Sequence, residues 1–360
     1  MTRPDPPDDS TRGADGLTYG DAGVDIGAGE KAVELIKEHV RSTFRPEVIG
    51  DVGGFGGLFA LGKLGHRDPV LVLSTDGVGT KSAIARMMER YDTIGLDVVA
   101  MSVDDIAVQG AEPLSFLDYL SVGKVIPETV DEIVRGVADG CRQAGCALSG
   151  GEISEHPDLM DPGEFDLVGF AVGIVERDEI LPRNVEPGDR IVGFGSPGLR
   201  CNGYSLARRA LLDRRGRSLD EPAWDGAHHS LGDELLLPSV IYAPAMAELR
   251  RHVDVHAFAH ITGGGIPGNL VRALPDHCDG VVHRGTWDEP RVFTEIQRAG
   301  DVSDEEMEQV FNLGLGMLAV VPEDQLLHAL DAVRGAGRDA WAVGEIVDGH
   351  RRAHVARAGS

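Results

Sequence analysis

Apolar residues recur along the chain at two spacings, one typical of helices and one typical of buried strands. In the stretch 29–43, Val33, Ile36 and Val40 fall on one face of a helix, and charged residues occupy the other. The run Val70–Thr75 is short, apolar and followed by a glycine-rich turn, which indicates a buried strand. The first half of the chain is thus predicted to contain helices at 29–43, 92–109 and 128–144 and strands at 70–75, 114–122, 146–148 and 165–175.

A second series of elements follows the turn-rich segment 183–190, whose Pro-Gly-Asp sequence marks the expected domain boundary. Asn202 is the expected N-cap of a helix at 203–213, and the polar stretch 214–233 is interpreted as a surface loop. The other expected elements are helices at 241–251, from Pro267 and at 323–335, and strands at 191–195, 256–260, 314–321 and 340–347. A chain of 360 residues is long enough for two domains, which we place at 17–182 and 183–350, between a disordered acidic tail at 1–16 and a tail at 351–360.

The net charge excludes several classes of partner. The chain has 34 basic and 59 acidic residues, a formal charge of −25, which argues against nucleic acid or an anionic membrane as a partner. No apolar run approaches the ~18 residues of a membrane span, and residues 1–16 lack the apolar region of a signal peptide, so we expect a cytoplasmic protein. Lysine is rare and arginine abundant. An acidic, lysine-poor surface is what concentrated salt favours; a merely acidic cytosolic enzyme is the alternative.

The segment Ser74–Lys81 is the sharpest candidate for a phosphate site. Gly77 and Gly79 let a backbone approach a ligand, Asp76 could hold a metal ion, and Lys81 could reach a phosphate oxygen. The segment is not a Walker A loop, because the GxxxxGK[ST] spacing is absent. An ordinary strand-to-helix turn is the alternative reading.

Acidic residues follow in two further places. Asp104 and Asp105 lie within the expected helix 92–109, and adjacent acids cannot share one helix face, so at most one points inward. A carboxylate on the inner face needs a metal or a partner. Glu152 follows two glycines directly after a short apolar strand. Together, Asp76, Asp105 and Glu152 would supply the few oxygen ligands that Mg²⁺ on a nucleotide takes. The alternatives are that the acids are merely solvated and that the glycines form a plain turn.

Two more segments could contact phosphate, and one motif is set aside. The loop Thr262-Gly263-Gly264-Gly265 precedes an expected helix and could cradle a phosphate. Arg200 is a plausible phosphate ligand. The stretch Gly27–Ala32 fits the G-x-G-x-x-A dinucleotide fingerprint, but no clean βαβ unit surrounds it.

The order of these motifs and their residue sequences resemble those of one family, the phosphoribosylformylglycinamidine cyclo-ligases, also called aminoimidazole ribonucleotide synthetases. The resemblance extends over residues 19–347, nearly the whole chain. It is carried by Ala22–Ile26, Arg45–Val48, Gly53–Gly57, Ser74–Lys81, Asp92–Met101, Val108–Leu114, Phe116–Tyr119, Gly150–Glu152, Asn202–Leu206, His260–Gly265 and Phe311–Met317.

The resemblance implies a fold and a reaction. The expected fold is an α+β subunit in which a β-rich N-terminal domain pairs with that of a second subunit in a dimeric barrel, and the C-terminal domain is a sheet flanked by helices. ATP and substrate would lie where domains and subunits meet. The implied reaction is the ATP-dependent cyclisation of formylglycinamidine ribonucleotide to 5-aminoimidazole ribonucleotide, with release of ADP and phosphate. It would proceed by phosphorylation of the formyl oxygen and ring closure, with Mg²⁺ and a candidate role for K⁺.

The resemblance also assigns expected roles to individual residues. The candidate catalytic residues are Lys81, Asp105 and Arg200. The expected nucleotide- and phosphate-binding residues are Asp25, Gly77, Gly79, Thr80, Lys81, Thr262, Gly263, Gly264 and Gly265, and the expected metal ligands are Asp76, Asp104, Asp105 and Glu152.

The chain departs from the family pattern at two of these positions. Asp104 stands where the family usually has Asn, which adds a carboxylate near the expected metal site. Arg200-Cys201 stands where His-Ser is usual, and arginine can bind phosphate but cannot shuttle protons. Thiamine monophosphate kinase, selenophosphate synthetase and formylglycinamidine synthase have similar ATP-binding architectures and remain alternatives, as does a nucleotide-binding protein without catalysis.

Overall fold

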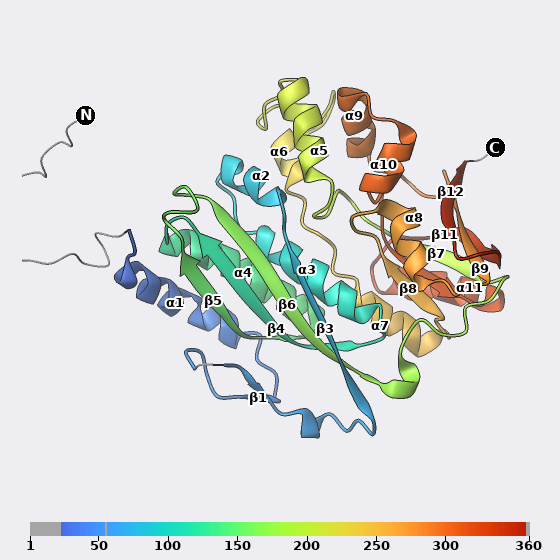
Figure 1. Cartoon of the computed structure of the whole chain (residues 1–360), viewed down its shortest axis with the longest axis horizontal. Helices are drawn as coiled ribbons and strands as arrows, with labels where there is room; N and C mark the ends of the chain where they lie inside the picture. The colour runs from blue at the N-terminus through green and yellow to red at the C-terminus, as the bar shows by residue number, and fades with distance from the viewer. Residues whose placement is uncertain (1–22, 55, 358–360) are drawn as a thin grey trace, which may run out of the picture.

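The computed structural model describes residues 23–54 and 56–357, which form two domains, each built around one β-sheet (Figure 1). The N-terminal sheet has the order β3-β6-β4-β5, with β4 and β5 parallel and the other neighbours antiparallel. A two-stranded ribbon, β1 and β2, precedes it. The elements are α1 (Ile26–Arg41), β1 (Val48–Ile49), β2 (Leu58–Phe59), β3 (Pro69–Gly77), α2 (Lys81–Met88), α3 (Ile94–Ala107), β4 (Glu112–Val122), α4 (Pro127–Ala144), β5 (Ala147–Glu155) and β6 (Phe165–Glu176).

Helix α3 is the central helix of the molecule. It packs against β3, β4 and β6 on one side and against α4 on another, and α7 of the C-terminal domain also reaches it. Almost every residue of α3 is therefore buried, including the carboxylates of Asp97 and Asp104. Because a buried charge is costly without a partner, these two aspartates require cations or N–H donors close by.

The sheet face opposite α3 and α4 carries apolar side chains that reach solvent. Along β3, exposed and half-buried residues alternate, as expected for a strand with one covered face. Leu71 and Leu73 on β3, Tyr119 on β4 and Phe170 on β6 are 49%, 57%, 42% and 38% exposed. A group of large apolar residues on one open face is a candidate interaction surface.

The C-terminal domain contains a six-stranded sheet with the order β12-β9-β11-β7-β10-β8. Helix α11 packs on β7, β11 and α7, and α8 contacts the edge strands β8 and β12. The elements are β7 (Arg190–Gly195), α5 (Tyr204–Arg208), a π-helical segment (Arg209–Arg214), α6 (Leu231–Leu235), α7 (Ala243–His252), β8 (Ala257–His260), α8 (Gly265–Leu270), β9 (Cys278–Arg284), α9 (Arg291–Gly300), α10 (Asp304–Val310), β10 (Leu315–Val321), α11 (Leu326–Gly335), β11 (Ala340–Asp348) and β12 (Ala353–Arg357).

Several sequence predictions need correction. Strand β5 continues to Glu155, so Gly150-Gly151-Glu152 lies within a strand and not in a turn after it. Gly203, with φ of 81°, is the N-cap of α5 in place of Asn202. The expected tail at 351–360 includes strand β12, which pairs in parallel with β9. Strand β9 and helices α9 and α10 had not been predicted, and the expected tail at 1–16 lies outside the described residues.

Candidate functional site

A cavity of about 520 Å³ lies between the domains, where the edge strand β3 faces the edge strand β8. We call it the interdomain cavity. Its apolar walls come from β3, the 180–182 linker and Phe258, and its polar lining comprises Ser74, Asp105, Gln109, His260, Asn269 and Arg272.

One of the predicted metal ligands, Asp105, lines this cavity, and a second, Asp76, lies close enough to Asp105 for their charges to interact. Asp105 accepts hydrogen bonds from His260 Nδ1 at 2.8 Å and from the Ser74 hydroxyl at 3.1 Å. Burial raises the pKa of Asp105, but these two hydrogen bonds together with nearby positive charge, including that of Arg272, bring the pKa below its usual value. Burial and the neighbouring Asp105 charge raise the pKa of Asp76, which lies near the end of β3. The hydrogen bond that Asp76 accepts from the Gly77 N–H lowers this pKa, but by less. Oxygen ligands in such a pair suit a hard cation such as Mg²⁺.

Glu152 and Asp25 lie elsewhere, at a second cavity of about 1020 Å³ between α1 and β5, which we call the glycine-lined cavity. Strand β5 is the edge of the sheet opposite β3, so Glu152 is separated from Asp76 and Asp105 within one chain. Among the described residues, no group of three or more His, Cys, Asp or Glu side chains could hold a metal. Asp25 caps α1 by accepting from the Ala28 N–H at 3.0 Å. The other lining residues include Gly53, Gly54, Gly56, Gly57, Gly150, Gly151 and Asp118.

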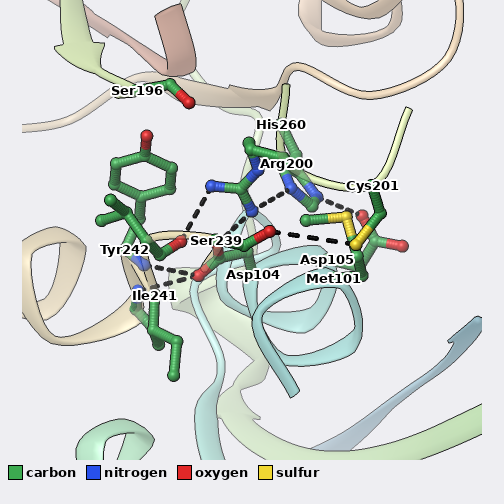
Figure 2. A network of polar contacts seen from close by, with 12 residues as sticks. Met101, Asp104, Asp105, Ser196, Arg200, Cys201, Ser239, Ile241, Tyr242 and His260 are labelled. Atoms are coloured by element: carbon green, nitrogen blue, oxygen red, sulfur yellow. Dashed lines mark hydrogen bonds and ion pairs between the residues drawn. The ribbon is translucent and has the colours of Figure 1, made fainter. Parts of the chain in front are cut away.

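Asp104 is not available to a metal ion, which corrects the prediction made for it. Its carboxylate is fully buried; one oxygen pairs with Arg200 Nη2 at 3.0 Å. The other oxygen accepts from the backbone N–H groups of Tyr242 at 2.8 Å and Ala243 at 3.0 Å, at the start of α7 (Figure 2). The two departures from the family pattern therefore meet in one ion pair.

Arg200 is likewise enclosed, so the structure does not support a contact with phosphate. Its side chain is 1% exposed and donates to the Val240 carbonyl at 2.8 Å, in addition to Asp104. The guanidinium also lies over the Tyr242 ring, 4.7 Å from its centroid, and within 3.0 Å of His260 Nε2 (Figure 2).

Lys81 has the same kind of environment, and its ammonium does not face a phosphate site. It lies 2.6 Å from Asp97 and 2.7 Å from the Leu237 carbonyl, and its side chain is fully buried. Asp97 also accepts from the Ser239 N–H at 2.8 Å. Lys81–Asp97 and Arg200–Asp104 are thus two buried ion pairs that hold the segment 237–243 against α3.

The two glycine-rich loops lie against neighbouring residues at the start of α5. Thr80 Oγ1 lies 3.1 Å from Ser205 Oγ, so the loop Gly77–Thr80 meets the start of α5 across the domain boundary. A Cβ at Gly263 would lie 3.4 Å from Asn202 Oδ1, which places the loop 262–265 on the other side of the same region. Both loops contain backbone in the left-handed region, with φ of 56° at Gly79 and 98° at Gly264.

Asn269 is a functional candidate that the sequence analysis missed. Its side-chain amide donates to the carbonyls of Thr262 at 3.3 Å, Gly263 at 3.3 Å and Gly265 at 2.8 Å. Because one side chain occupies three carbonyls of the loop, the loop is held in one conformation while N–H groups remain for an anion. Its position in the first turns of the helix after a glycine loop is the signal that could have identified it.

The comparisons with known proteins agree over most of the chain. Residues 60–175 match the family model for the N-terminal domain of AIR synthase related proteins, and residues 186–356 match the model for the C-terminal domain. A phosphoribosylformylglycinamidine cyclo-ligase of Anaeromyxobacter sp. (strain Fw109-5) is 54% identical, over 92% of this chain and 96% of that protein. One of Trichlorobacter lovleyi is 48% identical, over 91% and 94%.

Solved structures share the fold at lower sequence identity. A thiamine-monophosphate kinase of Stenotrophomonas maltophilia has a TM-score of 0.63 and 20% identity, over 89% of this chain and 95% of that one. A hydrogenase maturation protein HypE in complex with ATP has a TM-score of 0.59 and 16% identity, over 90% and 91%. No helix among the described residues is long and apolar enough to cross a membrane.

Proposed function

This chain belongs to the phosphoribosylformylglycinamidine cyclo-ligase family, an enzyme family of purine biosynthesis, and from that premise we propose that it closes the imidazole ring of 5-aminoimidazole ribonucleotide. The substrates would be ATP and formylglycinamidine ribonucleotide, and the products would include ADP and phosphate. We expect the enzyme in the cytoplasm. The observation that carries the proposal is that Asp105, which lines the interdomain cavity, lies close to Asp76, while the two glycine-rich loops lie against the same segment 202–205.

The chemistry explains why such a site is needed. An amide oxygen is a poor leaving group. Transfer of the γ-phosphoryl group of ATP to the formyl oxygen solves this, because the phosphorylated oxygen can leave as phosphate. The amidine-side nitrogen then attacks the activated carbon, the ring closes and the carbon–oxygen bond breaks with release of phosphate. The protein must hold the γ-phosphate and the formyl oxygen in line and stabilise the negative charge that spreads over the phosphoryl oxygens.

The residues of the candidate site suit these tasks. Asp76 and Asp105 would hold Mg²⁺, which when bound neutralises phosphate charge. The loops at 77–80 and 262–265 would direct backbone N–H groups at phosphate oxygens, and Asn269 would keep the second loop in place. K⁺ is the remaining cofactor candidate.

We also propose that the enzyme acts as a homodimer built on the open face of the N-terminal sheet. The exposed residues Leu71, Leu73, Tyr119 and Phe170 make that face apolar. Glu152 and the glycine-lined cavity lie at the edge of the sheet remote from Asp76 and Asp105. Face-to-face pairing of two sheets would let Glu152 of one subunit approach the Asp76–Asp105 pair of the other, so that each site is completed by both chains.

A coupled assay tests the reaction. Purified protein, ATP, Mg²⁺ and formylglycinamidine ribonucleotide are mixed in low and in molar KCl, and aminoimidazole product and phosphate are followed together. We expect equal amounts of product and phosphate, and NaCl in place of KCl tests the cation. ADP without free phosphate would favour a kinase, and ATP binding without turnover would favour a non-catalytic protein.

Matched variants test the site itself. Asp105→Asn is expected to lower kcat at least about 100-fold, because the substitution removes a charge from the phosphate-facing pair. Asp225→Asn, in an exposed turn, is the control and should leave kcat unchanged. Equal activity of the two variants would contradict the role of Asp105.

A further inference from the structure

Arg200 contacts one residue of the candidate site directly, and this contact has chemical consequences. Its Nη2 lies 3.0 Å from Nε2 of His260, whose Nδ1 lies 2.8 Å from Asp105 (Figure 2). His260 comes from the C-terminal domain, at the end of β8, whereas Asp105 comes from α3 of the N-terminal domain. The imidazole therefore links Arg200 to a carboxylate at the interdomain cavity.

The chemistry of the guanidinium decides the protonation of that ring. An arginine side chain has donors and no acceptor, and it stays charged at all ordinary pH values. His260 Nε2 can therefore take part in the contact only as an acceptor, without a proton. A neutral imidazole with a bare Nε2 carries its proton on Nδ1, which then donates to Asp105.

Arg200 is held in the position that this arrangement requires. Asp104 supplies the opposite charge within the same buried space, and the Val240 carbonyl accepts from Nη1 at 2.8 Å. The Arg200 backbone has φ of 64°, in the left-handed region that residues with side chains rarely adopt. Asp104 is in turn oriented by the Tyr242 and Ala243 N–H groups.

The second buried ion pair shows that this arrangement does more than join the domains. Lys81 and Asp97 hold the same segment 237–243 against the same helix, through the Leu237 carbonyl and the Ser239 N–H. Within the described part of the chain, neither side chain of that pair forms a hydrogen bond or an ion pair with a histidine. Holding the segment therefore does not require a contact with His260, and the contact that Arg200 makes is an additional feature.

We propose that Arg200 and Asp104 are positioning residues that fix His260 as its Nδ1–H tautomer and thereby orient the Asp105 carboxylate in the interdomain cavity. Both side chains are almost completely buried, so they act through His260 and not on the substrate. The proposal rests on the proposed function only for its kinetic consequence; the tautomer itself can be measured on the protein without substrate.

The test is NMR of protein labelled with ¹⁵N at histidine, because the two neutral tautomers give different ¹⁵N shifts and couplings to the ring protons. The His260 signals are assigned by their loss in His260→Gln. In the wild-type protein at pH 8 we expect the Nδ1–H pattern at His260. An Nε2–H pattern or a doubly protonated ring in the wild type would overturn the proposal without any variant.

Two methionine variants then separate positioning from stability. Arg200→Met removes the donor to Nε2 and should release His260 toward the Nε2–H tautomer. Lys81→Met removes the cation of the other ion pair and should leave the His260 pattern unchanged, although it also destabilises the domain contact. An unchanged His260 pattern in folded Arg200→Met would refute the proposal.

Arg200→Lys keeps the proposal testable if Arg200→Met fails to fold. A lysine ammonium can still donate to Nε2 while remaining paired with Asp104, so the Nδ1–H pattern should persist. Loss of that pattern in folded Arg200→Lys would count against the proposal.

Kinetics supply the second readout. Arg200→Met should lower kcat by roughly 10- to 100-fold, the usual effect of losing a residue that orients a metal or phosphate ligand. The KM for ATP should change much less, and Arg200→Lys should recover part of kcat. If the wild-type protein closes no ring at all, the proposed function fails while the NMR result still decides the tautomer.

Discussion

At the scale of single residues, the environment of each side chain decides its role more than its type does. Lys81, Arg200 and Asp104 have the charges expected of a phosphate or metal site, yet each is buried in an ion pair. Removing one partner of such a pair leaves an uncompensated buried charge, which costs about 3–5 kcal/mol of stability. Asp105, half-exposed at the cavity, is the acidic residue of α3 that remains available to a ligand.

Asp118 on β4 should make stability depend on pH. Burial raises its pKa from 3.8 to about 7, so the folded protein binds more protons than the unfolded chain between these two values. Stability from this group is therefore present below about pH 4 and is lost as the pH rises toward 7. Asp118→Asn should gain stability relative to the wild type on going from pH 5 to pH 8, measured by urea unfolding without ATP or Mg²⁺. A difference between the two proteins that does not change with pH would contradict the assignment.

At the scale of elements, close backbone contact between α3 and α4 sets the position of the site. A Cβ at Gly95 would lie 2.1 Å from the Val137 nitrogen, and one at Gly136 would lie 2.6 Å from the Asp92 carbonyl. These glycines let the two helices approach until their backbones touch. Because α3 carries Asp97, Asp104 and Asp105, any shift of this helix displaces both ion pairs and the cavity wall.

Gly95→Ala should therefore destabilise the protein by about 1–3 kcal/mol or more, since the helices must separate to admit the methyl group. Gly29→Ala, within α1, is the matched control: no atom lies within 4 Å of its added Cβ. Removing a helical glycine there should stabilise by about 0.5–1 kcal/mol. Urea unfolding of both variants measures the contrast, and similar effects of the two substitutions would show that the helix contact is not tight.

At the scale of the whole molecule, two domains and, by our proposal, two subunits are needed to assemble one site. The interdomain cavity combines β3 and α3 of one domain with β8 and α8 of the other. The glycine-lined cavity lies within the N-terminal domain. The two parts of the predicted site lie at opposite edges of the N-terminal sheet, since β3 lines the first cavity and β5 lines the second.

Leu73→Glu should prevent dimer formation, because it places a charge within the apolar face, where Leu73 is 57% exposed. Leu327→Glu is the control, since Leu327 is 74% exposed on α11 of the C-terminal domain. Sedimentation equilibrium should give monomers for the first variant and dimers for the second. Dimers of Leu73→Glu with wild-type affinity would exclude this face as the interface.

Salt should stabilise the fold as a whole. A chain with a net charge of −25 repels itself, and the screening length falls from about 10 Å at 0.1 M salt to about 3 Å at 1 M. The thermal unfolding midpoint should therefore rise between low and molar KCl. A midpoint that is indifferent to salt would refute the adaptation to concentrated salt predicted from the composition.

The sequence by itself determined the family and the main helices and strands of the N-terminal domain. Helices α1, α3 and α4 and strands β3, β4 and β6 lie where apolar spacing predicts them, because helix and strand periodicity are local properties of the chain. The length of β5 was not predictable, since glycines within a strand look like a turn until neighbouring strands pair with them.

Only the tertiary structure decided which predicted site residues meet. Arg200 and Asp104 are 96 positions apart, and nothing in the local pattern of either segment identifies the other as its partner. The same is true of the separation of Glu152 from Asp76 and Asp105, which follows from strand order. A ligand set depends on distances between segments brought together by folding, so spacing along the chain cannot determine it.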